Sequence, residues 1–146
     1  MKQIVFLLFL FPLFMQAQGE AHWLTKYDKA IKVAQKENKN VLVYFTGSDW
    51  CAPCKKLKTD LFDTDAFADI SKDYVLLYVD YPRNQDLLSD DQKKHNKQLV
   101  SKLNTRGVFP LLKVLNKRGN ALDEYSGYSM TGDVQHHLNF LKKNRS

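Results

Sequence analysis

The sequence predicts an α/β fold in which a central mixed sheet of four strands is flanked by helices. Two observations support this prediction. Segments whose apolar residues recur at helical spacing alternate along the chain with short, continuous runs of β-branched and aromatic residues. No internal repeat, linker or low-complexity segment interrupts residues 18–146. We therefore expect one domain with the element order α β α β α β β α.

The first helix is expected over Lys26–Glu37, with Thr25 as its N-cap. The asparagines Asn38 and Asn40 end it. Trp23, just ahead of the helix, is expected to close over its apolar face. That face has i, i+3, i+4 and i+7 spacing and consists of Tyr27, Ala30, Ile31 and Ala34.

Two runs have the composition of strands that are buried on both faces, Val41–Phe45 (VLVYF) and Tyr74–Val79 (YVLLYV). Between them, Lys55–Leu61 predicts a helix that continues or restarts over Asp63–Ile70, where the first residue or Thr64 could be the cap. Because a helical segment connects the two strands, they should be parallel and central.

The second half of the chain predicts a helix, a hairpin and a last helix. Gln85–Leu103 is polar except near its end, which indicates a helix with a short apolar face. Leu111–Leu115 and Ala121–Tyr125 are strands joined by the turn NKRGN. Thr131 is the expected N-cap of the final helix. Its apolar face consists of Val134, Leu138 and Leu141.

The N-terminal residues are set apart from the fold. Lys2 precedes an unbroken apolar run over Ile4–Met15. A membrane-spanning helix needs about 20 such residues and the core of a secretory signal roughly 7 to 15, so the run predicts a signal peptide over residues 1–17. A buried helix or an uncleaved anchor is the alternative. Cleavage after Ala17 would leave residues 18–146 in an exported, periplasmic domain, in an oxidising compartment.

The charge of the chain suggests no nucleic-acid partner. The 22 Lys and Arg residues outnumber the 16 Asp and Glu residues, which gives a net charge of +6. The densest basic runs, Lys93–Lys97 and Lys142–Arg145, have the pattern of solvated helix surface. No platform of aromatic and basic residues accompanies them.

The only two cysteines, Cys51 and Cys54, lie three residues apart. A structural staple would close so short a loop that it removes little entropy from the unfolded chain. A zinc site needs two more ligands, and none of the four histidines has a matching spacing. A cysteine protease would leave the second cysteine unexplained. We therefore favour redox chemistry.

The position of the pair at the start of a predicted helix suits such chemistry. Cys51 would lie at the helix N-terminus, where unpaired N–H groups and the macrodipole stabilise a thiolate. Cysteines in such positions have pKa values of about 3.5 to 7.5, against about 8.5 for a free thiol. Cys54 would lie one turn deeper, and Pro53 suits the first turn.

The segment Trp50–Lys55 (WCAPCK) resembles the active-site motif W-C-G-P-C-K of the thioredoxin superfamily and differs from it only at Ala52. A second signature is RGVFPLL, in which Pro110 matches the cis-proline of thioredoxins. The resemblance covers nearly all of residues 18–146 and implies a thioredoxin fold. It looks closest to secreted thioredoxin-like proteins of Gram-negative, Bacteroidetes-type bacteria and to the soluble thioredoxin-like domain of transmembrane disulfide reductases.

The resemblance implies roles for several residues. Cys51 would be the catalytic nucleophile and Cys54 the resolving cysteine. Trp50, Phe109 and Pro110 would bind the substrate. A cis peptide before Pro110 would leave the backbone N–H and C=O of Phe109 free to pair with a substrate strand. Ordinary packing is the alternative role for the two aromatic residues.

Two departures from the thioredoxin pattern affect proton transfer and the loop. Tyr44 stands where thioredoxins have a buried aspartate that helps to deprotonate the resolving cysteine. The loop before the motif is also one residue longer. Asp49 or a water molecule could accept the proton of Cys54, although Asp49 fits a surface loop equally well.

The expected function is thiol–disulfide oxidoreductase, with net reduction of disulfides in exported proteins. Such a reductase implies disulfide-containing protein substrates and a membrane thiol reductase as electron donor, and it requires no cofactor or metal. Oxidase, isomerase and cytochrome-maturation activities stay open within this class. The alternative from another class is a non-catalytic peptide-binding or chaperone module with the same fold.

Overall fold

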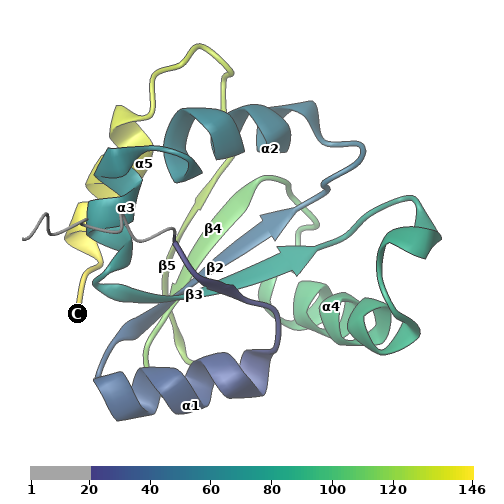
Figure 1. Ribbon diagram of the computed structural model, residues 1–146, viewed down its shortest axis with the longest axis horizontal. Coiled ribbons are helices and arrows are strands. Elements are labelled where there is room, and N and C mark those ends of the chain that lie inside the picture. The colour runs from purple at the N-terminus through teal and green to yellow at the C-terminus, as the bar shows by residue number, and fades with distance from the viewer. Residues whose placement is uncertain (1–20) are drawn as a thin grey trace, which may run out of the picture.

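The computed structural model describes residues 21–146 (Figure 1). The predicted signal peptide lies outside these residues. Within them, no helix combines the length and apolar character needed to cross a membrane. The strands are β1 (Trp23–Leu24), β2 (Asn40–Thr46), β3 (Tyr74–Asp80), β4 (Leu111–Leu115) and β5 (Ala121–Ser126). The helices are α1 (Tyr27–Glu37), α2 (Ala52–Leu57), α3 (Asp65–Ser71), α4 (Asp90–Leu103) and α5 (Gln135–Lys143).

The five strands form one mixed sheet in the order β1-β3-β2-β4-β5. β2 is parallel to β3 and antiparallel to β4, and β4 and β5 form the predicted hairpin. The prediction of four strands is wrong by one. Strand β1 has only two residues, which pair with Leu76 and Leu77 of β3, and so short a strand leaves no alternating pattern in the sequence.

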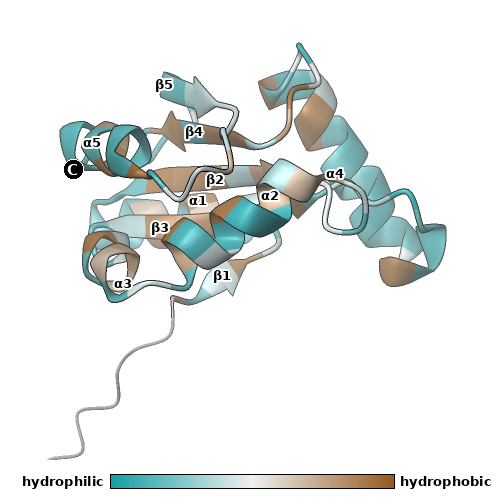
Figure 2. Cartoon of the chain, turned by 90° about the horizontal axis from the view of Figure 1, so that it is seen from above, coloured by the Kyte–Doolittle hydropathy of each residue, from teal (hydrophilic) through white to brown (hydrophobic). Residues whose placement is uncertain are grey.

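Helices cover both faces of the sheet. Figure 1 shows α1 and α4 below the strands and α2, α3 and α5 above them. Figure 2, which looks from above, shows the hydrophobic residues concentrated along β2, β3 and β4. Because both faces of the central strands are covered, every residue of Val41–Phe45 is buried, as its composition predicts.

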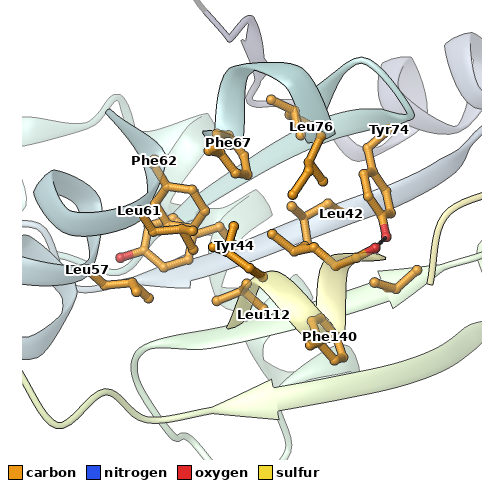
Figure 3. Close-up of a cluster of buried hydrophobic side chains, with 14 residues drawn as sticks. Leu42, Tyr44, Leu57, Leu61, Phe62, Phe67, Tyr74, Leu76, Leu112 and Phe140 are labelled. Atoms are coloured by element: carbon orange, nitrogen blue, oxygen red, sulfur yellow. Dashed lines mark hydrogen bonds between the residues drawn. The ribbon is translucent and has the colours of Figure 1, made fainter. Parts of the chain in front are cut away.

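The core on the side of α2, α3 and α5 is rich in aromatic rings, some of which Figure 3 shows around Tyr44. Trp23 belongs to this side and stacks on Phe67 with the ring centroids 6.0 Å apart. The expectation that Trp23 covers α1 is therefore wrong. Successive residues of a strand point to opposite faces, so Leu24 packs on the α1 side and Trp23 on the other.

The helix starts differ from the prediction in two places. At α1, the N–H of Tyr27 donates to Nε2 of His95 on α4, and no side chain at the Lys26 N-cap accepts a bond. At α5, Asp133 rather than Thr131 accepts the N–H of Gln135. Thr25 and Thr131 are thus not the caps, because a distant residue and a closer carboxylate take those bonds.

The predicted central and late helices are each divided. After α2 the chain makes a wider π-helical turn, η1 (Lys58–Phe62), and then restarts at α3 with Thr64 as N-cap. The predicted helix Gln85–Leu103 is a 3₁₀ turn, η2 (Gln85–Leu87), followed by α4. Ser89 caps α4 by accepting from the N–H of Gln92.

Candidate active site

The two cysteines form a disulfide at the C-terminal edge of β2. Their Cα atoms are 5.2 Å apart. Beyond Thr46 the chain turns so that the carbonyl of Gly47 accepts the N–H of Cys51 at 2.8 Å, and α2 begins at the next residue. Cys51 is the N-cap of α2, and its sulfur accepts the N–H of Cys54 at 3.3 Å. The predicted placement of Cys51 at a helix start is confirmed.

Both sulfur-bearing residues are nearly covered in this disulfide state. Cys51 is 3% exposed and Cys54 1%. Cys51 is therefore shielded from solvent in the oxidised site. Cys54 is the deeper of the two, as predicted.

The peptide bond between Phe109 and Pro110 is cis, as the resemblance implies. Leu111 is paired with Phe45, so this bond lies at the edge of the sheet from which the cysteine segment departs. Within residues 21–146, the backbone N–H and C=O of Phe109 have no hydrogen-bond partner. The carbonyl of Pro110, in contrast, accepts the N–H of Gly127 at 2.9 Å.

Trp50 and Phe109 meet beside the disulfide. Their ring centroids are 5.4 Å apart in an edge-to-face arrangement. The indole Nε1–H of Trp50 donates to the carbonyl of Tyr81 at 2.8 Å. Both rings are half-buried, so they combine packing with a surface that borders the site.

Asp80 was not predicted to support the site. It is 7% exposed, and its carboxylate accepts the backbone N–H of Ser48 at 2.9 Å and the Ser48 hydroxyl at 2.6 Å. Asn96 donates to the carbonyl of Asp80 at 2.7 Å. The loop before the cysteines is thus attached to the end of β3. A polar residue that ends a buried strand run is the signal that could have indicated this role.

Asn104, another residue that the prediction missed, holds the loop that precedes Pro110. Its Nδ2 donates to the carbonyl of Val108 at 2.8 Å, and its Oδ1 accepts the N–H of Val108 at 3.1 Å. Asn104 is buried. This pair of bonds positions the residue next to Phe109.

Asp49 fastens a loop and has no bond to Cys54. Its carboxylate accepts the backbone N–H groups of Asn84 at 2.7 Å and Arg83 at 3.0 Å. The bond from Asn84, followed by that from Arg83, lowers the pKa of Asp49, and the nearby charge of Lys55 acts in the same direction. These contacts fit the loop interpretation of Asp49 and give the proton-acceptor interpretation no support.

Tyr44 lies where the thioredoxin pattern has an acid. Its hydroxyl donates to the carbonyl of Cys54 at 3.0 Å in the core. Burial raises the pKa of Tyr44 far above its ordinary value, so the phenol keeps its proton. Tyr44 therefore supports the helix that carries Cys54 and does not act as a base.

The described residues contain no cluster of three or more His, Cys, Asp or Glu side chains arranged to hold a metal ion. Lys55, at the end of the cysteine motif, is exposed, and its Nζ donates to the carbonyl of Asp49 at 3.2 Å.

A sulfur pair at a helix start, at the same end of a mixed sheet as a cis-proline loop, defines a thioredoxin-type protein. A sequence model of the thioredoxin-like domain matches residues 27–142. The chain belongs to this family.

One relative is disulfide bond reductase DsbH of Chlamydia pneumoniae, which is 26% identical over 107 residues. The match covers 73% of this chain and 63% of DsbH, so the chain spans less than two thirds of that relative.

Solved structures show the same fold at low sequence identity. A DsbH oxidoreductase has a TM-score of 0.68 at 23% identity, with 76% of each chain covered. A disulphide isomerase from Xylella fastidiosa Temecula1 has a TM-score of 0.59 at 18% identity, covering 80% of this chain and 86% of the isomerase. A thioredoxin from Thermus thermophilus has a TM-score of 0.60 at 16% identity, covering 86% and 87%.

Proposed function

We propose that the protein is an exported, periplasmic thiol–disulfide oxidoreductase that reduces disulfides in exported proteins. The observation that carries this proposal is the Cys51–Cys54 disulfide at the start of α2, beside the Phe109–Pro110 peptide. The relative DsbH is named a disulfide bond reductase, which supports reduction rather than oxidation of substrate disulfides. The apolar run over Ile4–Met15 supports export.

The proposed cycle transfers two electrons from the reduced cysteines to a substrate disulfide. The Cys51 thiolate attacks one substrate sulfur, so a mixed disulfide forms and one substrate thiolate leaves. The Cys54 thiolate then attacks the Cys51 sulfur and releases the second substrate thiolate. The two protons lost by the cysteines are balanced by the two that the substrate thiolates take up.

The substrate segment is proposed to bind as an extended strand beside Phe109. The unpaired N–H and C=O of Phe109 offer one donor and one acceptor for such a strand. Trp50, Phe109 and Pro110 form the apolar wall next to the sulfur. Strand pairing needs no particular side chain, so this part of the site would accept many protein substrates.

Each turnover leaves the site oxidised, so a reductase needs a source of electrons. In an oxidising compartment we propose a membrane thiol reductase as that donor, acting by the same exchange on the Cys51–Cys54 disulfide. No cofactor takes part in the proposed cycle.

The test is the reduction of insulin by the purified protein with dithiothreitol as electron source. We expect wild type to accelerate the reaction and Cys51→Ser to abolish it. Pre-reduced Cys54→Ser, mixed with insulin after the dithiothreitol is removed, should instead accumulate the mixed disulfide. A wild-type protein that binds peptides but does not accelerate reduction would contradict the proposal and support the binding module.

The reduction potential of the Cys51, Cys54 couple tests whether the protein reduces substrate disulfides or forms them. A reductase should lie near thioredoxin, at about −270 mV, and a strong oxidant near about −120 mV. A value at the oxidising end would overturn the proposed direction while leaving the oxidoreductase class intact.

A further inference from the structure

The loop between β3 and α4 extends the aromatic border of the site. Tyr81, its first residue, is 39% exposed, and its ring stacks on that of Phe109 with the centroids 6.2 Å apart and the planes at 17°. Phe109 in turn contacts Trp50. The three rings form one surface that begins at the cysteine motif and ends at Tyr81.

Arg83 places a positive charge over this surface. Its Cζ atom lies 4.9 Å from the centroid of the Trp50 ring. The backbone N–H of Arg83 donates to the carboxylate of Asp49, and this bond fixes the position of the Arg83 backbone in the loop. Among residues 21–146, Arg83 has no carboxylate within salt-bridge distance.

Charges of both signs lie near the surface, and Arg83 is the cation that lies over one of its rings. The Asp49 carboxylate is occupied by two backbone N–H groups, and Asp80 is bound to Ser48. Lys94 and Lys97 line a cavity of about 250 Å³ beside Tyr81. The remaining acids of this region are Asp86, Asp90 and Asp91, of which Asp90 is paired with Lys93.

We propose that Arg83, together with the ring of Tyr81, selects substrates that carry an aspartate or glutamate near the disulfide under attack. This inference rests on the proposed function. A segment laid across the three rings would bring such a carboxylate to the guanidinium, whose fork of N–H donors matches two carboxylate oxygens. The occupant is therefore an acidic, extended segment of an exported protein.

The test compares two synthetic peptides that contain the same internal disulfide. One has Glu two residues from the cysteine, and the other has Gln at that position. We expect wild type to reduce the Glu peptide about three- to fivefold faster, as kcat/KM at low salt, because one exposed charge pair has this modest effect. The preference should shrink in 0.5 M NaCl.

Arg83→Gln should abolish the preference, and Arg83→Glu should reverse it. Arg118→Glu is the matched control. It makes the same charge change in the turn between β4 and β5, at the end of the sheet away from the cysteines. We expect Arg118→Glu to retain the wild-type preference.

Equal rates for both peptides with wild type would overturn this inference and leave the proposed function standing, since both peptides are still reduced. A preference that survives Arg83→Glu but disappears in Lys94→Glu would also overturn it. If wild type reduces neither the peptides nor insulin, the proposed function fails and the inference with it.

Discussion

Gly47 has no Cβ atom, and this leaves room for the indole of Trp50. A Cβ atom at position 47 would lie 2.3 Å from Cε2 and 2.5 Å from Nε1 of that ring, distances that side-chain carbons do not adopt. The ring cannot move aside freely, because Nε1 donates to Tyr81 and its edge meets Phe109. The glycine is therefore a requirement of the site and not of a turn conformation.

We expect Gly47→Ala to displace Trp50 and to lower kcat/KM for insulin reduction by about tenfold or more, since a misplaced wall misaligns the bound substrate. Circular dichroism should show that the fold is retained. Gly132→Ala is the control, because a Cβ there meets nothing within 4 Å, although its φ of +87° adds backbone strain. Full activity in Gly47→Ala would show that the position of the indole is unimportant.

A substitution at Tyr44 should affect the stability of the protein without affecting its activity. Tyr44→Phe removes a buried hydrogen bond to the carbonyl of Cys54, and we expect the free energy of unfolding to fall by about 1 kcal/mol. Because the phenol keeps its proton, activity should stay within about twofold of wild type. Urea unfolding and insulin reduction measure the two effects, with Tyr81→Phe as stability control. A large loss of activity in Tyr44→Phe would give the hydroxyl a chemical role.

At the scale of elements, the break between α2 and α3 shapes the core under the site. The π-helical turn η1 places Leu57, Leu61 and Phe62 on the buried side of one continuous helical segment. The chain then restarts at Thr64, whose hydroxyl accepts the N–H of Phe67 and donates to the carbonyl of Leu61. Thr64 therefore joins the two helical pieces.

Thr64→Ala should lower the free energy of unfolding by about 1 kcal/mol, the usual cost of losing an N-cap. Urea denaturation of the oxidised protein measures this change. Thr105→Ala is the matched control, because Thr105 is exposed and its side chain has no hydrogen bond within the described residues. Equal stability of the two variants would exclude a capping role for Thr64.

Across the whole molecule, His137 connects α5 to the cis-proline loop. It is 3% exposed, and its Nε2–H donates to the carbonyl of Gly127, whose own N–H donates to the carbonyl of Pro110. The Nδ1 atom has no partner among the described residues. Burial lowers the pKa of His137, with a smaller contribution from His136, while the Gly127 bond and Asp133 act in the opposite direction.

This arrangement predicts a loss of stability in mild acid. The folded pKa of His137 lies below the unfolded value of about 6.5, so its stabilising effect is complete above that pH and is lost as the pH falls toward the folded pKa. The free energy of unfolding should fall by up to about 1.4 kcal/mol per pH unit from this group.

Urea unfolding at pH 7.5, 6.5 and 5.5 measures the slope. His137→Phe should flatten the dependence below pH 6.5, whereas His136→Gln, at an exposed neighbouring histidine, should keep the wild-type slope. The prediction is contradicted if His137→Phe has the same pH dependence as wild type.

Local patterns were sufficient for most of the fold. The composition of Val41–Phe45 and Tyr74–Val79 predicts two buried parallel strands, and the pairing between β2 and β3 confirms them. Leu111–Leu115 is predicted to the residue. The spacing of Cys51 and Cys54 before a helix predicts the disulfide chemistry, because these constraints act within a few residues along the chain.

Tertiary structure alone decided which distant residues hold the site. The bond from Tyr27 to His95, the attachment of Ser48 to Asp80 and the stacking of Tyr81 on Phe109 each join segments more than 25 residues apart. Tertiary packing also determined on which face of the sheet Trp23 lies. Such contacts depend on how the strands are ordered and how helices pack on them, and no periodic pattern in the sequence encodes which partner a given polar or aromatic side chain will meet.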